Sequence, residues 1–143
     1  MTNDATLTGV GITLADQATD TLTVGGTADL EAGTGAIIIG PAGTANFGSL
    51  TFNSTNSVSI QEDSTTQLTG SSTANSLSLT STGAITDATG ALLNVTSNGT
   101  FTGVGITLMI RRRDALCIGG TADLEASSSA SRSARQERRT SAA

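Results

Sequence analysis

The sequence predicts an all-β fold: a parallel β-helix, or β-solenoid-like stack of short strands, followed by a disordered C-terminal tail. Three observations carry this prediction. Apolar residues alternate with Thr, Ser or Asn at a period of two, related segments recur along the chain, and Gly, Asn and Asp separate the alternating runs. One such segment is too short to bury its own apolar face, and stacking on its neighbours solves that problem.

The alternation is clearest at residues 50–52, 58–60 and 77–79, which read LTF, VSI and LSL. Strands of this kind place every second side chain on the same face of a sheet. We therefore expect an apolar core filled from one face of each strand, in four or five turns about 20–25 Å high at the strand spacing. The expected core residues are Leu22, Val24, Leu50, Phe52, Val58, Ile60, Leu77, Leu79, Ile85, Leu93, Val95 and Phe101.

A repeat with an offset of 94 residues runs through the chain. Residues 6–14 read TLTGVGITL and residues 100–108 read TFTGVGITL, while GGTADLEA occurs at both 25–32 and 119–126. A weaker period of about 23 residues lies inside this repeat, a length typical of solenoid units. Its units begin at leucines, which we expect to line up in the folded chain: Leu22, Leu50, Leu77 and Leu93.

Residues 49–63, 75–90 and 92–103 give this chain a resemblance to the repeat region of large bacterial surface adhesins, which are filamentous-haemagglutinin-like and autotransporter passenger-like proteins. The resemblance implies β-strand repeats with a structural role and no catalytic activity. It also implies a location at the cell surface or in the secreted fraction, for a segment of a longer exported protein. The first fourteen residues lack a basic stretch and a long apolar core, so we predict no export signal in this chain.

Composition excludes several kinds of chemistry. The chain of 143 residues is long enough for one domain, and it has no His, Lys, Trp or Tyr. Without His and Lys there is no Ser–His–Asp triad, no His-ligated metal site and no Schiff base. The longest apolar run, residues 36–39, is too short for a membrane-spanning helix. A single cysteine, Cys117, excludes an intrachain disulfide and is expected to be a small buried residue. We predict no enzyme, no cofactor and no metal.

Charge divides the chain into two parts. Residues 1–110 hold eight acidic residues and no basic ones, whereas residues 111–143 hold seven Arg and four acidic residues. We expect a solenoid repeat region over residues 1–126, poorly formed after residue 108, and a disordered Ser/Arg-rich tail over residues 127–143.

The arginine-rich segments have the pattern of out-of-frame translation. The 94-residue offset predicts that residues 134–143 resemble residues 40–49, GPAGTANFGS, but they read ARQERRTSAA. One permitted set of codons for residues 40–49, read one base later, spells those ten residues. The same shift applied to residues 16–20 spells Ile-Arg-Arg-Arg, as found at residues 110–113. We interpret both segments as frame-shifted copies.

Four candidate sites compete with simpler structural interpretations. The glycines at 9–11 and 33–40 are typical of turns, because no helix is expected after them to complete a phosphate-binding loop. The adjacent acids Glu62 and Asp63 are interpreted as solvated turn residues and not as a calcium site. Scattered acids without a base disfavour a polysaccharide lyase or hydrolase. The clusters Arg111–Arg113 and Arg138–Arg139 would bind nucleic acid or anionic lipid by charge neutralisation alone.

The favoured function is that of a structural repeat fragment of a cell-surface adhesin-like protein. Three alternatives stay open: a degenerate gene fragment without function of its own, a nucleic-acid-binding or membrane-associated protein that uses the Arg tail, and a carbohydrate-active β-helix enzyme. No partner is identifiable from the sequence. Candidates are other repeats of the same kind or a host or cell-surface glycan, with no specific nucleic acid and no membrane-spanning segment. We expect self-association through uncapped ends, starting at residues 36–39.

Overall fold

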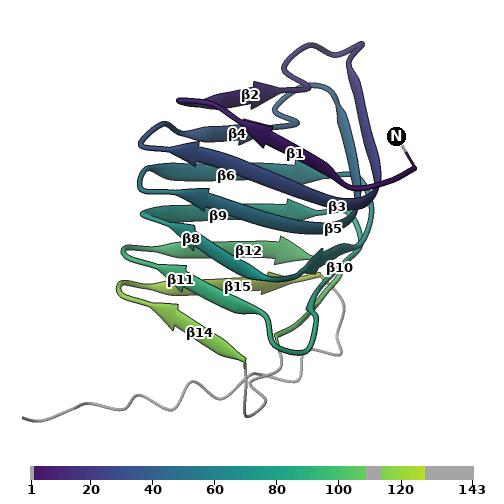
Figure 1. The fold of residues 1–143 in the computed structure, drawn as a ribbon. Coiled ribbons are helices and arrows are strands. Elements are labelled where there is room, and N and C mark those ends of the chain that lie inside the picture. Colours follow the sequence, from purple (N-terminus) through teal and green to yellow (C-terminus); the bar gives the residue numbers. More distant parts are fainter. Residues whose placement is uncertain (1, 109–113, 128–143) are drawn as a thin grey trace, which may run out of the picture.

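The computed structural model describes residues 2–108 and 114–127, and these residues form a β-solenoid of about five turns (Figure 1). Every strand pairing among them is parallel, and they contain no helix. The predicted fold class is therefore confirmed. The predicted disordered tail lies outside the described residues from position 128 onward, as do Arg111–Arg113.

The strands wind through two sheets in every turn. Among the described residues, one sheet has nine strands and the other has six. The nine-stranded sheet contains β1 (Ala5–Thr8), β3 (Thr21–Gly33), β5 (Thr44–Ser54), β7 (Thr66–Leu68), β8 (Ser71–Ala74), β10 (Ala84–Asp87), β11 (Leu92–Val95), β13 (Gly105–Thr107) and β14 (Ala115–Ile118). The six-stranded sheet contains β2 (Ile12–Leu14), β4 (Ile37–Ile39), β6 (Ser57–Glu62), β9 (Ser76–Ser81), β12 (Gly99–Gly103) and β15 (Ala122–Ala126).

The nine-stranded sheet forms two of the three sides of each turn. The long strands β3 and β5 run along both sides, and their register shifts between Val24 and Thr27, where β3 bends. In later turns each long strand is replaced by two short ones. Strand β5 accordingly pairs with β7 at Leu68 and with β8 at Thr73. The six-stranded sheet closes the third side.

One column of paired residues measures the length of each turn. On the outer face of the nine-stranded sheet the column runs through Thr8, Glu31, Asn53, Thr73, Asn94 and Cys117. Successive members are 23, 22, 20, 21 and 23 residues apart. The predicted unit of about 23 residues is therefore close to the length of one turn of the coil.

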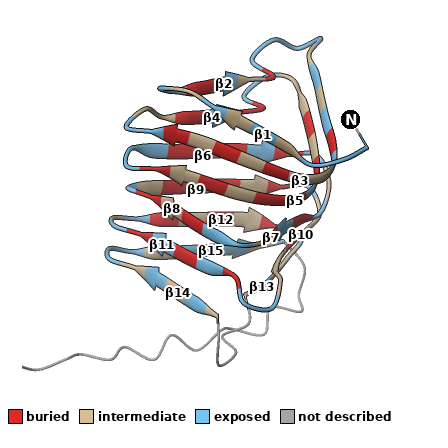
Figure 2. Cartoon of the chain, in the orientation of Figure 1, coloured by how far each residue is buried: buried red, intermediate tan, exposed pale blue. Residues whose placement is uncertain are grey.

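Alternation of side chains fills the core as the sequence predicts. Buried and exposed residues alternate along the strands of both sheets (Figure 2). All the expected core residues are buried except Leu22, which is half-buried and packs against the core. The core also takes in apolar residues that were not predicted, among them Leu30, Ile37, Ile39, Phe47 and Leu68.

The expected alignment of four leucines is wrong. Leu22 pairs with Ala45, Leu77 pairs with Val58, and Leu50 pairs with Ala28 and Leu68. Leu93 pairs with Leu116 in yet another column. The reason is that each turn offers inward positions on all three sides, and leucine fills any of them. A leucine therefore does not mark the place of its strand in the turn.

The 94-residue repeat is also out of phase with the coil. Four turns lead from Thr8 to Asn94, a separation of 86 residues, so a shift of 94 residues carries the chain on to the next side. In the first copy of GGTADLEA, Ala28 pairs with Leu50 in the nine-stranded sheet. In the second copy, Ala122 pairs with Gly99 in the six-stranded sheet. Identical segments therefore occupy different sides of the solenoid.

The segment 36–39 was expected to start self-association, but it lies inside a sheet. Strand β4 pairs with β2 on one side and with β6 on the other, and Ile37 and Ile39 point into the core. In the described part of the chain, the edges without a neighbouring strand belong to β1, β2 and residues 21–24 of β3 at one end and to β13, β14 and β15 at the other. An exposed edge therefore exists, but it is not at the expected segment.

Candidate binding face

A polar column covers the outer face of the nine-stranded sheet. Asn53 stands at its centre, where its Nδ2 donates a hydrogen bond of 2.7 Å to Glu31 Oε1. Its Oδ1 accepts one of 3.0 Å from the Thr73 hydroxyl. Three successive turns are thus linked through one side chain, because residues in register stand one strand spacing apart. We call the column Thr8, Glu31, Asn53, Thr73 and Asn94 the polar ladder.

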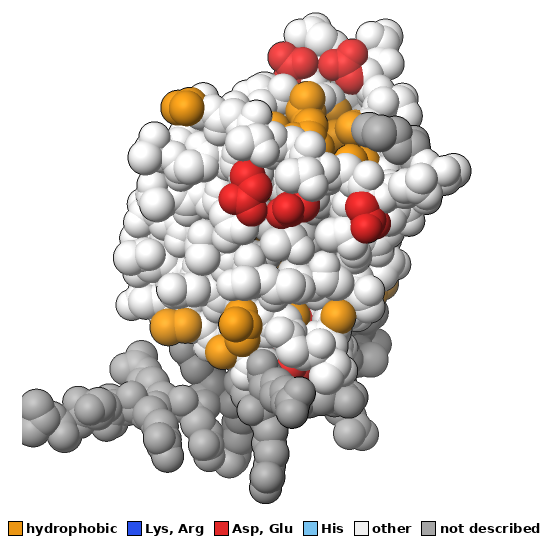
Figure 3. All heavy atoms as spheres, viewed as in Figure 1, with side chains coloured by type: hydrophobic (Ala, Val, Ile, Leu, Met, Phe, Trp, Pro, Cys, Tyr) orange, Lys and Arg blue, Asp and Glu red, His pale blue; other side chains and the backbone are white. Residues whose placement is uncertain are grey.

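A shallow depression of about 380 Å³ opens beside the upper part of the polar ladder. Figure 3 shows acidic side chains gathered on this face. The floor is formed by β1, β3 and β5, whose outward residues all carry oxygen. The lining residues are Asp4, Thr6, Thr27, Asp29, Glu31, Thr51 and Asn53.

Three carboxylates line this depression, contrary to the expectation that the acids are scattered. Asp29 and Glu31 are two residues apart on β3 and point to the same outer face. Asp4 reaches the same place from the N-terminal segment, where its Oδ1 accepts a hydrogen bond of 2.8 Å from the Thr27 N–H. The sequence could not show this meeting, because it depends on the register between the N-terminal segment and β3.

The pKa of Asp29 is raised. Burial is the main cause, followed by the charge of Glu31 and by a hydrogen bond between the two carboxyl groups. Asp29 Oδ1 is buried and has no hydrogen-bond partner among the described atoms. A depression lined in this way offers mostly acceptors, so its chemistry suits a ligand rich in hydroxyl or ammonium donors. Among the described residues, no group of three or more acidic or thiol side chains could hold a metal ion.

Glu62 is buried, and its interpretation as a solvated turn acid is wrong. It is 2% exposed. Its Oε1 accepts hydrogen bonds from the Phe47 N–H and the Ser64 hydroxyl, and its Oε2 accepts one from the Thr66 hydroxyl. Burial raises the pKa of this carboxyl, while the three hydrogen bonds lower it in part. The alternation of Val58 and Ile60 continues to Glu62, so the period of two was the signal for its burial.

The glycine candidates are turn glycines. Positive φ angles of 90°, 57° and 70° occur at Gly11, Gly33 and Gly40, which lie at or beside corners of the coil. Because no helix follows them in the described part of the chain, they do not form a phosphate-binding loop of the strand–helix kind.

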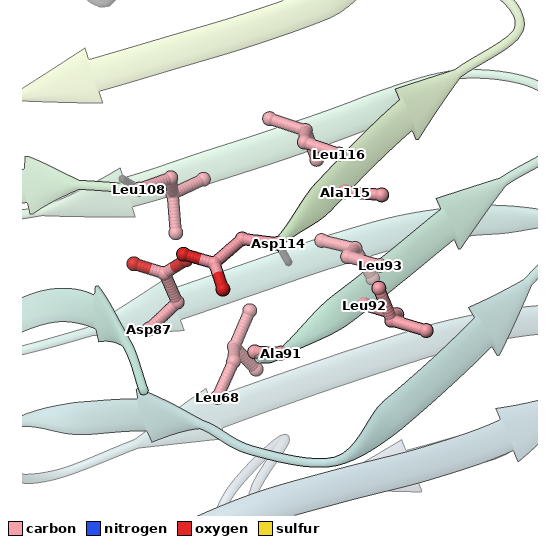
Figure 4. A pocket seen from close by; sticks show the side chains of 9 residues that line it. All are labelled: Leu68, Asp87, Ala91, Leu92, Leu93, Leu108, Asp114, Ala115 and Leu116. Carbon is pink, nitrogen blue, oxygen red and sulfur yellow. The ribbon is translucent and has the colours of Figure 1, made fainter. Parts of the chain in front are cut away.

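A small cavity lies near the C-terminal end of the stack. It has a volume of about 20 Å³ and is lined mainly by apolar side chains from β7, β11 and β14, together with Asp87 and Asp114. The two carboxyl groups lie close to each other beside Leu108 (Figure 4). A space of this size holds about one water molecule, so it is too small for an organic ligand.

Cys117 is exposed on the outer face of β14, which contradicts the expectation that it is buried. Its position extends the polar ladder, whose members all point outward.

The residues described include no helix that could cross a membrane. Both arginine clusters, Arg111–Arg113 and Arg138–Arg139, lie outside the described residues.

Comparison with known proteins returned no match. No protein-family model matches the chain, and neither a curated protein nor a solved structure matches it.

Proposed function

We propose that this chain is a structural repeat segment of an adhesin-like stem. The observation that carries the proposal is the continuity of the stack. Inward apolar residues from both sheets form one core along the whole solenoid, so length grows by one strand spacing of about 4.8 Å with each turn. A protein of this kind holds a surface away from its point of attachment, and it needs no catalytic centre to do so.

The outer surface is compatible with this role. The polar ladder joins turns through hydrogen bonds between side chains, as at Asn53, and this leaves the face polar and hydrated. Adhesin-like sequence segments at 49–63 and 75–90 contribute strands to both sheets of the stack. The proposed location is the cell surface or the secreted fraction, within a longer exported protein.

The nucleotide sequence around the coding region tests this proposal. An array of related repeats in frame with the chain, upstream or downstream, is the expected result. Stop codons close to both ends in every frame would overturn the stem and would favour the alternative of a degenerate fragment. The same sequence shows whether residues 134–143 are a shifted reading of residues 40–49.

A second candidate function is binding of a glycan in the acidic depression. The specific observation is the convergence of Asp4, Asp29 and Glu31 in a space of about 380 Å³, which offers acceptors to sugar hydroxyl groups. Binding to a glycan panel by the full chain, lost in Glu31→Gln and kept in Asp16→Asn, would support it. Asp16 is the control because it is exposed and lies outside the depression. Hydrolysis of any glycan on the panel would instead support the carbohydrate-active enzyme.

A further inference from the structure

Among residues 2–108 and 114–127, no element covers the core at either end of the solenoid. Apolar residues that are only partly buried against the core belong to its first and last turns. At the N-terminal end they are Ala5, Leu7, Leu14 and Leu22, and at the C-terminal end they are Ile106, Leu108, Leu116 and Ile118. Leu124 of β15 is 44% exposed.

The backbone of β1 and β2 points hydrogen-bonding groups away from the stack. Gly9 N–H donates to Glu31 O, so by the alternation of a parallel ladder the N–H groups of Thr6 and Thr8 face the open edge. Ile12 N–H donates to Ala36 O, which leaves Thr13 facing the open edge of β2. These donors and acceptors have no strand beyond them in the described residues.

At the opposite end of the stack, the free backbone groups of β14 and β15 alternate in the way that pairing with β1 and β2 requires. The Ala115 N–H donates to Ala91 O, just before β11, and the Gly119 N–H donates to Val95 O at the end of β11. Leu116 and Ile118 therefore face the open edge of β14. Ser127 N–H donates to Gly103 O, so Leu124 faces the open edge of β15. If strand β1 of a second copy lay beside the open edge of β14, its N–H and C=O groups would therefore face unpaired C=O and N–H groups of β14. The same holds for β2 of the second copy beside β15.

If β1 of a second copy paired with β14, and β2 with β15, the inward columns of side chains would continue from one copy into the next. Leu7 pairs with Leu30 at the top of one inward column, and Leu116 pairs with Leu93 at its lower end. A second copy would place its Leu7 on Leu116. In the six-stranded sheet the column that starts at Leu14 ends at Leu124, so leucine again meets leucine.

We propose that the chain associates head to tail with a second copy of itself, β1 on β14 and β2 on β15. The contact repeats the interface that each turn already makes with the next, and because it is heterologous and does not close, it adds copies in a row. On the third side, one strand position stays open between β13 of one copy and residues 21–24 of the next. The inference applies to the 143-residue chain as a separate molecule, because neighbouring turns of a longer protein would occupy the same edges.

Cysteine cross-linking of the full chain tests this geometry. Cys117 ends the column that Thr8 begins, so Thr8→Cys places two thiols on adjacent strands of neighbouring copies, with Cα atoms about 4.8 Å apart. This separation lies within the range for a disulfide. With oxidised glutathione as the oxidant, we expect a ladder of covalent oligomers on a non-reducing gel. Mass spectrometry should identify the link as one between positions 8 and 117.

The matched control is Thr6→Cys, on the same outer face of β1 but two residues earlier. Its Cα would lie roughly 8 Å from that of Cys117, which is too far for a disulfide, so we expect no ladder. Thr8→Cys combined with Cys117→Ser should form no covalent dimer on the non-reducing gel, because a disulfide in that variant would link two N-terminal ends. Such a dimer would overturn the proposal. So would the absence of 8–117 links in Thr8→Cys, provided that circular dichroism shows the wild-type content of strand.

Discussion

Ile12 and Ile106 occupy the same position in two copies of the segment TGVGITL, yet they lie in different sheets. Ile12 pairs with Ile37 in the six-stranded sheet, whereas Ile106 pairs with Ile85 in the nine-stranded sheet. Local sequence is the same in both places, so it cannot be what selects the side of the solenoid. The length of the preceding turns selects it, because each strand must align with the strand one turn earlier.

The two copies of this segment make a matched test of backbone strain. Gly11 has a φ of 90°, where an L-residue is strained, but the equivalent Gly105 has no such angle and nothing within 4 Å of an added Cβ. We expect Gly11→Ala to lower the free energy of unfolding by about 1–2 kcal/mol. Gly105→Ala should change it by less than about 0.5 kcal/mol. Urea denaturation of both variants measures the difference, and equal effects would contradict the phase shift between the copies.

The period of two made the core residues predictable from the sequence. The length of each turn was not predictable in this way. Val58, Ile60 and Leu79 are buried where the alternation placed them. The same alternation places Glu62 inward, but a carboxylate in the core is costly, so a turn was the natural interpretation. Its hydrogen bonds come from Phe47, Ser64 and Thr66, and those residues come together only when β5 and β6 are placed in the coil.

The candidate binding face was less predictable than the core. The ladder of Glu31, Asn53 and Thr73 needs registers of 22 and 20 residues, and no constant repeat supplies both. Corners of different lengths, and a bend within β3 near Val24, produce these unequal steps. Alternation along a strand is a local property, whereas residues that meet across turns depend on every loop between them.

Truncation of Phe52 tests how far the core is cooperative. Its side chain is 0% exposed and sits on β5 near the middle of the stack. We expect Phe52→Ala to lower the free energy of unfolding by about 3–5 kcal/mol, since it leaves a cavity that the sheets cannot close. Val10→Ala is the control, because Val10 is 88% exposed and should contribute almost nothing. A thermal melt that loses only part of its cooperative transition in Phe52→Ala would contradict a single continuous core.

A charge introduced into the polar ladder should destabilise the stack. Asn53→Asp replaces the amide that donates to Glu31 Oε1 with a second carboxylate, so two negative charges face each other across adjacent strands. We expect a loss of about 1 kcal/mol at neutral pH, which shrinks in high salt and below about pH 4. Thermal melts at two salt concentrations measure it.

The same substitution at Asn94 is the matched control. Asn94 lies in the same ladder, but its neighbours across the strands are Thr73 and Cys117, and neither of them is a carboxylate. Asn94→Asp should therefore have little effect. If both variants lose the same stability, the cost comes from the loss of the amide and not from repulsion by Glu31.

Burial of Glu62 makes stability depend on pH. Its pKa is raised in the folded chain, mainly by desolvation, so the folded state holds this proton more tightly than the unfolded state does. The contribution of Glu62 is therefore most favourable below its ordinary value of 4.5 and is lost as pH rises through the higher folded pKa. Glu62→Gln keeps an oxygen for the Phe47 N–H but removes the charge. We expect the variant to be more stable than the wild type near neutral pH, by about 1 kcal/mol, and to lose this advantage near pH 4.

Thermal melts of both proteins between about pH 4 and pH 7 measure this crossover, because only the carboxylate form carries the desolvation cost. Asp16→Asn controls for the change in net charge, since Asp16 is also acidic but lies exposed at the surface. A Glu62→Gln variant that is less stable than the wild type by the same amount at every pH would show that the two carboxylate oxygens are needed as acceptors. In that case the hydrogen bonds to Phe47, Ser64 and Thr66 outweigh the cost of burying the charge.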